Sequence, residues 1–378
     1  MALSLPRKWK NSIFFTSTLT PNLKVNGFRS KSALEAIAKA REEEKIQTLV
    51  LYNYPSFSGA FSALFAHLFH SNFNLPHLIL PFSSVHPFSV QDFCFEGLER
   101  CYLFDFLGPP GFASMLSKKT MCQVLGFDHR KSLLSRISSI EECPENVTFH
   151  VDVEKSSSSV VYEYYSNRLI DMKSPNGAVA RLLNPEDQDR VEMVLKYVED
   201  VDIRRWSLPD IRAFSVGLSE WRSKLNCITN PFIFEELLEI SSTSLIAKGN
   251  SYISSRQSAA SKLLEKVFKV RLGRGLYGEC LGVRADGNSN LSDEIGRQLS
   301  VKSAEAGLRP MGAVVYLQRN NLKMCLRSTD NATDTSEVAK FPLLSPSLKA
   351  YGGGGSRSSS SFIIRMDEYN RWLSDSPS

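Results

Sequence analysis

Three polar side chains of different chemical types follow one apolar segment in the first half of the chain. Cys122–Phe127 predicts a buried strand, and Asp128, His129 and Arg130 come directly after it. Carboxylate and imidazole groups bind metal ions, whereas a guanidinium binds phosphate through paired hydrogen bonds. The pattern therefore predicts a site for a metal ion or a phosphate group. The alternative is a strand that ends in an ordinary polar turn.

A second carboxylate follows a neighbouring segment of the same kind. Cys101–Phe104 predicts a strand that ends at Asp105. In parallel α/β sheets, ligands bind at the carboxyl ends of the strands. We therefore expect Asp105, Asp128 and His129 to lie close together and to form a metal site.

Strand and helix patterns alternate along the chain. Thr48–Tyr52 predicts a strand, the Pro/Gly/Ser-rich Asn53–Gly59 a turn, and Ala60–Phe69 a helix. From Val267 onward, strand patterns and one helix recur over a shorter length. The sequence thus predicts an α/β protein, with a parallel-sheet N-terminal domain and a smaller C-terminal α/β domain.

Three further segments carry local expectations. Ser32–Lys45 predicts a helix with Ser32 as its N-cap, and Glu154–Ser159 predicts an exposed loop. Glu186–Val198 predicts a helix that is followed by the acidic stretch Glu199–Asp202. Acidic residues at the carboxyl end of a helix interact unfavourably with the helix dipole. Residues that are locally unfavourable in this way concentrate at functional sites. A solvated acidic turn is the alternative.

The first residues differ in composition from the rest. Met1–Lys31 contains six basic residues and no acidic residue, and Ser, Thr and Asn are frequent. This composition predicts an organelle transit peptide, hence a chloroplast or mitochondrion. If the segment is only a disordered basic arm, the protein is expected in the cytoplasm. Removing these residues changes the formal net charge from +5 to −1, so the overall basicity is no argument for nucleic-acid binding.

Composition also bears on other classes of protein. No apolar run reaches the roughly 18–20 residues needed to span a bilayer, so we expect no membrane association. The seven cysteines are scattered without a CxxC pair, which argues against a disulfide framework or a zinc site. Irregularly spaced histidines, with no carboxylate at helical spacing, are expected to be structural: His67, His70, His77 and His86.

A glycine-rich stretch lies near the end of the chain. Tyr351–Phe362 reads YGGGGSRSSSSF. Glycines permit close backbone approach, and successive N–H groups form anion-binding nests, to which Arg357 would add charge. A flexible linker is the alternative. However, a strand pattern at Phe362–Ile364 and a helix pattern at Asp367–Leu373 follow at once, and too few residues remain for a further domain.

Taken together, five stretches resemble the DHH phosphoesterase superfamily, the RecJ-like metal-dependent hydrolases. The resemblance extends over about Thr48 to Leu373, and the stretches are specific as an ordered set: LYNYPSFSGAF, FDFLGPPGF, GFDHRKS, YVEDVDIRRW and GGGGSRSSSSF. It implies a parallel-sheet DHH domain and a mixed α/β DHH-associated domain, with the active site in the cleft between them. The expected parts are a leader at 1–31, a DHH-like domain at 32–225, a helical connector at 226–265 and the C-terminal domain at 266–378.

The resemblance also assigns roles to residues. It implies metal ligands at Asp105, His129 and Asp200, with Asp128 in a supporting position behind them. Several family positions are substituted in this chain: Tyr52, Ser56, Ser58 and Ser356. Arg130 stands where the family has a histidine. The positions expected to bind phosphate or substrate are Arg130, Arg327, Ser328, Gly352, Gly353, Gly354, Gly355 and Arg357. The segment Phe341–Lys349 is an expected insertion.

These substitutions leave two functions open. The family uses two divalent cations, usually manganese, and here at most one well-formed Mn²⁺ or Mg²⁺ site is expected. Arg130 cannot act as a general base, but it can hold a phosphate. The first hypothesis is a phosphoesterase of weakened activity on a nucleotide or short oligonucleotide. The alternatives are a non-catalytic pseudoenzyme that binds a nucleotide or single-stranded nucleic acid, and a structural partner of an active paralogue. A homo-oligomer is compatible with each.

Overall fold

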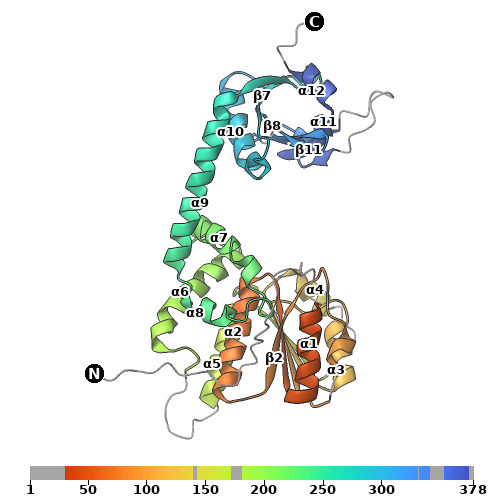
Figure 1. The fold of residues 1–378 in the computed structure, drawn as a ribbon, viewed down its shortest axis with the longest axis vertical. Coiled ribbons are helices and arrows are strands. Elements are labelled where there is room, and N and C mark those ends of the chain that lie inside the picture. The colour runs from red at the N-terminus through yellow and green to blue at the C-terminus, as the bar shows by residue number, and fades with distance from the viewer. Residues whose placement is uncertain are drawn as a thin grey trace, which may run out of the picture. The chain divides into compact units, whose positions relative to one another are not determined.

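A computed structural model describes residues 30–94, 96–138, 143–171, 181–330, 332–340 and 353–373. The chain separates into two compact units, 1–250 and 251–378 (Figure 1). Residues 1–29 of the leader predicted at 1–31, the expected insertion and Gly352 lie outside the described residues.

The first unit is built on a five-stranded parallel sheet in the order β2-β1-β3-β4-β5. Every pair of neighbouring strands is parallel, as the sequence predicted for the N-terminal domain. All five strands therefore end at the same edge of the sheet. The strands are β1 (Thr48–Asn53), β2 (His77–Phe82), β3 (Arg100–Phe104), β4 (Gln123–Asp128) and β5 (Val147–Val151).

Helices cover both faces of this sheet, because successive residues of a strand point to opposite faces. Leu49 and Leu51 of β1 pack with one group of helices, and Val50 and Tyr52 pack with the other. The first group is α1 (Lys31–Lys39) and α3 (Phe112–Thr120). The second includes α2 (Phe57–Asn72), α5 (Ser157–Asp171), α6 (Pro185–Asp202), α7 (Ile211–Ser219) and α8 (Ile233–Glu239). Figure 1 shows these two groups on opposite sides of the sheet.

Two short elements and one long helix complete the first unit. A π-helical turn follows α1, and α4 follows β4; the long α9 includes the residues at which the two units divide. Gly217 and Gly249 let α7 and α9 approach closely, since a Cβ at Gly249 would lie 1.8 Å from the Ala213 carbonyl oxygen. The bounds are Ala40–Glu44 for the π-helical turn, Ser132–Ser138 for α4 and Ser242–Leu263 for α9.

Several local predictions were wrong. The first helix begins earlier than predicted, because Ser30 rather than Ser32 caps it by accepting a hydrogen bond from the Ala33 N–H. The segment predicted as an exposed loop at Glu154–Ser159 instead enters α5, and Ser156, Ser157 and Ser158 are buried.

Two other differences concern strand β2 and the end of α6. Strand β2 was not among the predicted strands. It contains Pro81, which is tolerated because β2 is an edge strand. Helix α6 continues through Asp202, beyond the predicted end at Val198. The acidic stretch therefore belongs to the last turn of α6, and Asp200 in this turn is buried.

The second unit contains a six-stranded mixed sheet in the order β10-β11-β9-β8-β7-β6. Only β7 and β8 pair in parallel, so the prediction of a smaller α/β domain with a mixed sheet is confirmed. Helix α10 packs on β7, β8 and β9 through Ile295 and Leu299, and the other face packs with α11 and α12.

The elements of the second unit follow each other closely along the chain. The strands are β6 (Phe268–Arg271), β7 (Glu279–Arg284), β8 (Gly312–Gln318), β9 (Asn321–Arg327), β10 (Gly354–Gly355) and β11 (Ser359–Ile364), and the helices are α10 (Ser292–Glu305), α11 (Thr335–Ala339) and α12 (Met366–Trp372). Among the residues that the structure describes, no helix has both the length and the apolar character needed to cross a membrane.

Candidate functional site

Asp105 is a buried carboxylate at the carboxyl edge of the parallel sheet. It follows β3 in the left-handed region (φ 62°), which aspartate tolerates better than most residues. Its Oδ2 accepts a hydrogen bond from Asn53 at 3.0 Å, and its Oδ1 accepts one from Ser157 at 3.0 Å. Burial alone would raise the pKa of Asp105, but hydrogen bonds from His129, Ser56 and Asn53 lower it. The side chain is therefore a buried anion.

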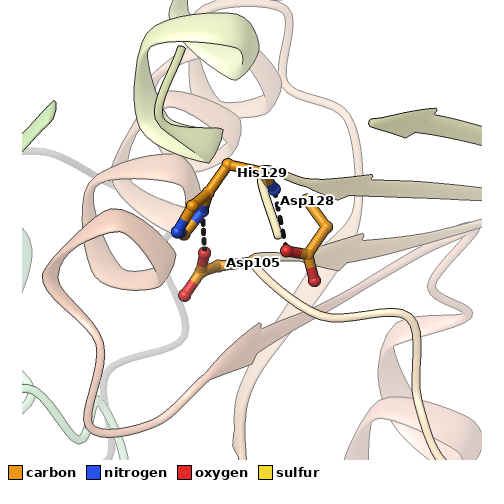
Figure 2. Close-up of side chains that lie close together, drawn as sticks. All are labelled: Asp105, Asp128 and His129. Carbon is orange, nitrogen blue, oxygen red and sulfur yellow. Dashed lines mark hydrogen bonds and ion pairs between the residues drawn. The ribbon is translucent and has the colours of Figure 1, made fainter. Parts of the chain in front are cut away.

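His129 lies directly against this anion. Its Nδ1 is 3.1 Å from Oδ1 of Asp105 (Figure 2). The same nitrogen is 3.2 Å from Oγ of Ser157. Burial opposes protonation of the imidazole, but the hydrogen bond to Asp105 and the nearby charges of Asp105, Asp202 and Asp128 raise the pKa of His129. The pair is thus arranged to hold a positive charge between the carboxylate and the ring, either as a proton or as a cation.

Asp128 is buried beside this pair but has its own partners. Its Oδ1 accepts hydrogen bonds from the backbone N–H groups of His129 at 2.7 Å and Arg130 at 3.0 Å. The Arg130 Nε donates to the same oxygen at 2.9 Å, and a terminal nitrogen of Arg130 pairs with Oδ2. That terminal nitrogen also donates to the Asp105 carbonyl at 3.1 Å. Arg130 therefore closes over Asp128 while 46% of its side chain stays exposed.

A carboxylate that the sequence did not single out completes the acidic group. Burial and the Asp105 carboxylate raise the pKa of Asp202 to about 7, although His129 and Ser58 act in the opposite direction. Within the described residues, Oδ2 of Asp202 is buried and has no hydrogen-bond partner. An unpartnered buried carboxylate oxygen is costly, so this atom is suited to a ligand that carries positive charge.

Asp200, predicted as a metal ligand, is placed differently. It is buried, and its oxygens accept hydrogen bonds from the backbone N–H of Ser207 at 3.0 and 3.2 Å and from the Ser207 hydroxyl at 2.6 Å. The Leu208 N–H adds a longer contact of 3.4 Å. Asp200 thus holds the loop after α6, and the structure does not bring it into the group formed by Asp105, Asp128 and His129.

The hydroxyl groups at the substituted positions of the first motif make hydrogen bonds to separate partners in the structure. Ser56 caps α2 by accepting from the Gly59 N–H at 3.2 Å. Ser58 accepts a hydrogen bond from the Ser158 N–H at 2.9 Å, and the hydroxyls of these two residues are 3.2 Å apart. The Tyr52 hydroxyl donates to the Leu225 carbonyl at 2.6 Å. Hydroxyl groups thus join the first turns of α2 and α5, at positions where the resemblance implies metal ligands.

The predicted substrate residues of β9 make contacts within the second unit. The Arg327 Nε donates to Asp293 of α10 at 2.8 Å, and its side chain packs where a Cβ at Gly296 would lie. The Ser328 hydroxyl donates to the Pro310 carbonyl at 2.7 Å. Both side chains therefore stabilise the domain in the described structure, and their predicted role in phosphate binding remains a prediction.

The glycine motif forms a hairpin rather than a linker. Gly354 and Gly355 pair antiparallel with Ser361 and Ser360, and the loop residues Arg357 and Ser358 connect the two strands. A Cβ at Gly353 would lie 2.5 Å from the Ala339 carbonyl oxygen, which explains the need for glycine at that position.

The ends of this hairpin are fixed to neighbouring elements. Ser356 closes the turn through its N–H to the Ser359 carbonyl at 2.8 Å, and the Thr335 N–H donates to the Arg357 carbonyl at 2.7 Å. Arg357 is exposed at the tip of the hairpin, so its guanidinium is open to an anionic ligand.

Sequence reasoning missed Asn53, Ser157 and Asp202. A signal for Asp202 exists, because the buried residues Val191, Leu195 and Val198 of α6 continue onto position 202 at helical spacing. For Ser157 the repeated serines resembled an exposed loop, and a hydroxyl next to Asp105 is visible only in three dimensions.

The group has the chemistry of one divalent cation site. Asp105, Asp128 and His129 each place a ligand atom so that these atoms lie within 4.8 Å of one another. Oxygen and imidazole nitrogen donors suit Mn²⁺ and Mg²⁺. Arg130 already neutralises Asp128, whereas Asp202 presents an unpartnered oxygen. The group formed by Asp105, Asp128 and His129 therefore fits one cation, and the nearby Asp202 carboxylate interacts electrostatically with Asp105 and His129.

No family model and no curated protein sequence matches the chain. Among solved structures, it is similar to an exopolyphosphatase-related protein from Bacteroides fragilis (12% identity, 90% of this chain and 94% of that one, TM-score 0.33). It is also similar to RecJ from Thermus thermophilus in complex with Mn²⁺ (14% identity, 93% and 55%, TM-score 0.32). CDC45 from Entamoeba histolytica matches at 11% identity over 90% and 98% of the chains, with a TM-score of 0.29.

At these identities and TM-scores, the likenesses carry no argument about this chain.

Proposed function

We propose that this chain is a divergent RecJ-like protein that binds the phosphate group of a nucleotide or short oligonucleotide with one divalent cation, and that it hydrolyses such esters weakly. The observation that supports this most directly is the ion pair between Arg130 and Asp128. This pair places the permanent positive charge of Arg130 next to the buried anion of Asp105 and its partner His129. Nearly half of the Arg130 side chain is exposed to solvent.

The same observation argues against efficient two-metal hydrolysis. A two-metal site needs several free carboxylate oxygens to hold both ions. Here Asp128 is neutralised by Arg130, and Asp200 is used by Ser207. Among the serines that replace ligands of the first motif, Ser56 accepts from the Gly59 N–H, and Ser58 bonds to the N–H and hydroxyl of Ser158. The residues at the carboxyl edge of the sheet can therefore hold at most one cation.

A bound divalent cation would supply positive charge that attracts and polarises a phosphate oxygen. The chain itself supplies the remaining functions. Asp105 orients His129 through Nδ1, and Arg130 offers guanidinium N–H groups on its exposed side to phosphate oxygens. The buried serines around Asp105 limit access of water to the carboxylate.

Titration of the full chain with Mn²⁺ by calorimetry tests the cation site. One Mn²⁺ per chain is expected, and Asp105→Asn or Asp202→Asn should weaken its binding by about 10-fold or more. Asp200→Asn is the matched control, because the amide keeps an acceptor for Ser207 and the residue lies outside the group; it should leave Mn²⁺ affinity unchanged. Two ions per chain, or a large effect of Asp200→Asn alone, would contradict the proposed site.

Binding and hydrolysis of pyrophosphate and of a 5′-phosphorylated dinucleotide, each with Mn²⁺, test the ligand. Saturable binding with slow hydrolysis that Asp105→Asn abolishes is the expected result. Binding without any turnover would favour the non-catalytic alternative. If neither compound binds, the proposed function is wrong in both forms.

A further inference from the structure

The loop between α6 and α7 has an unusual backbone. Arg204 and Trp206 both lie in the left-handed region, with φ of 59° and 54°. Non-glycine residues rarely adopt this conformation, and it persists where the surroundings hold it in place. Here Asp200 stabilises the loop conformation by accepting hydrogen bonds from the N–H and hydroxyl of Ser207. A buried carboxylate thus fixes the backbone directly after Trp206.

A second contact ties the loop to the candidate site. The Arg205 guanidinium donates to the Glu154 carbonyl at 2.5 Å and pairs with Glu199 at 3.4 Å. Three residues after Glu154, Ser157 donates to Asp105 and contacts His129. Arg205, which precedes Trp206, is therefore bonded to a residue that lies three positions before Ser157, a neighbour of Asp105 and His129.

The fixed loop presents an open aromatic ring. Trp206 keeps 48% of its surface exposed. Of the three tryptophans that the structure describes, Trp221 has the Lys224 ammonium 4.7 Å from its ring centroid, and Trp372 is buried with its indole N–H bonded to Glu368. Trp206 is thus the described tryptophan with a ring available to a ligand.

We propose that Trp206 is a stacking surface for the base of a nucleotide whose phosphate lies at Arg130 and His129. This inference rests on the proposed function and adds a residue that contacts the base of the ligand. Aromatic side chains bind nucleobases through their faces without regard to sequence, while phosphate contacts position the backbone. Trp206 therefore favours a nucleotide or single-stranded oligonucleotide with an unpaired base over an inorganic polyphosphate, which has no ring to stack.

The test compares two probes on the full chain: a 5′-phosphorylated dinucleotide and pyrophosphate, both with Mn²⁺. Base stacking on an aromatic side chain is worth about 5- to 140-fold in affinity. Trp206→Ala should lower dinucleotide affinity by that range and leave pyrophosphate affinity unchanged. Trp206→Tyr should restore most of the loss, because tyrosine retains an aromatic face. Phe232→Ala is the matched control, since Phe232 is an exposed aromatic residue of the same unit.

Fluorescence gives an independent readout of the same contact. The dinucleotide should quench the tryptophan emission of the natural chain, and the quenching should disappear in Trp206→Phe, which leaves the other tryptophans in place. Equal effects of Trp206→Ala on both probes, or none on either, would overturn the stacking role while phosphate binding stands. Failure of both probes to bind the natural chain would instead refute the proposed function.

Discussion

One edge of the Arg130 guanidinium pairs with the carboxylate of Asp128, so two residues that are two positions apart form a closed ion pair. Nε donates to Oδ1 at 2.9 Å, and a terminal nitrogen pairs with Oδ2. The backbone turn after β4 makes this possible, because the N–H groups of His129 and Arg130 also donate to Oδ1. Asp128 therefore has its charge balanced by the protein, without a metal ion.

Replacing this arginine should change cation binding. Arg130→His removes the guanidinium from Asp128 and adds an imidazole, so a carboxylate oxygen becomes available to a cation. We expect Mn²⁺ affinity to rise by about 10-fold, the scale of effects that supporting residues have on metal sites. Calorimetric titration measures this change. Arg136→His is the control, because Arg136 donates to the Gly108 carbonyl at 2.9 Å; an equal rise in both variants would contradict the explanation.

The meeting of Asp105, Asp128 and His129 could be predicted from the sequence. Each follows an apolar segment, and the carboxyl ends of parallel strands share one edge of a sheet. The choice between Asp200 and Asp202 could not be made from spacing alone. Two residues two positions apart on a helix point in different directions, and both are buried or largely so in α6. Their partners, Ser207 and the Asp105 group, come from other parts of the fold.

The role of Arg130 shows a different limit of sequence reasoning. Its charge and its position after a strand indicated a phosphate ligand, but its pairing with Asp128 depends on the backbone geometry of three consecutive residues. The serines before α5 show the same limit. A run of serines is typical of an exposed loop, and only the packing of α5 against α2 explains why Ser157 and Ser158 are buried.

The glycine hairpin offers a matched pair of substitutions in the second unit. A Cβ at Gly353 would lie 2.5 Å from both the Ala339 carbonyl oxygen and the Phe362 Cβ, whereas a Cβ at Gly354 would meet no atom within 4 Å. Gly353→Ala should therefore destabilise the sheet by about 1–3 kcal/mol, the usual cost of overpacking. Gly354→Ala should cost much less. Hydrogen–deuterium exchange of the β9 and β11 amides measures both, and similar protection in the two variants would contradict the packing argument.

Three histidines are packed together between α2 and β2, near the amino-terminal ends of the strands. His77 Nε2 is 3.4 Å from His67 Nδ1, and the His70 and His77 ring centroids are 5.2 Å apart. His70 Nδ1 lies 2.7 Å from the Ala66 carbonyl oxygen. Burial and mutual repulsion lower the pKa of His67 to about 3; burial, His77, Arg168 and Arg100 lower that of His70 to about 3. Burial also lowers the pKa of His77.

These lowered pKa values predict that acid destabilises the first unit. Below about pH 6.5 these histidines are protonated in the unfolded chain. In the folded chain, His67 and His70 stay neutral until about pH 3. The free energy of unfolding should therefore be highest above pH 6.5 and fall by up to about 1.4 kcal/mol per histidine per pH unit below it. Urea midpoints followed by circular dichroism at pH 7.5 and 5.5 measure the loss. His70→Phe should reduce it, whereas His86→Asn, at an exposed position, should not; an unchanged pH dependence in His70→Phe would show that the histidine cluster is not its source.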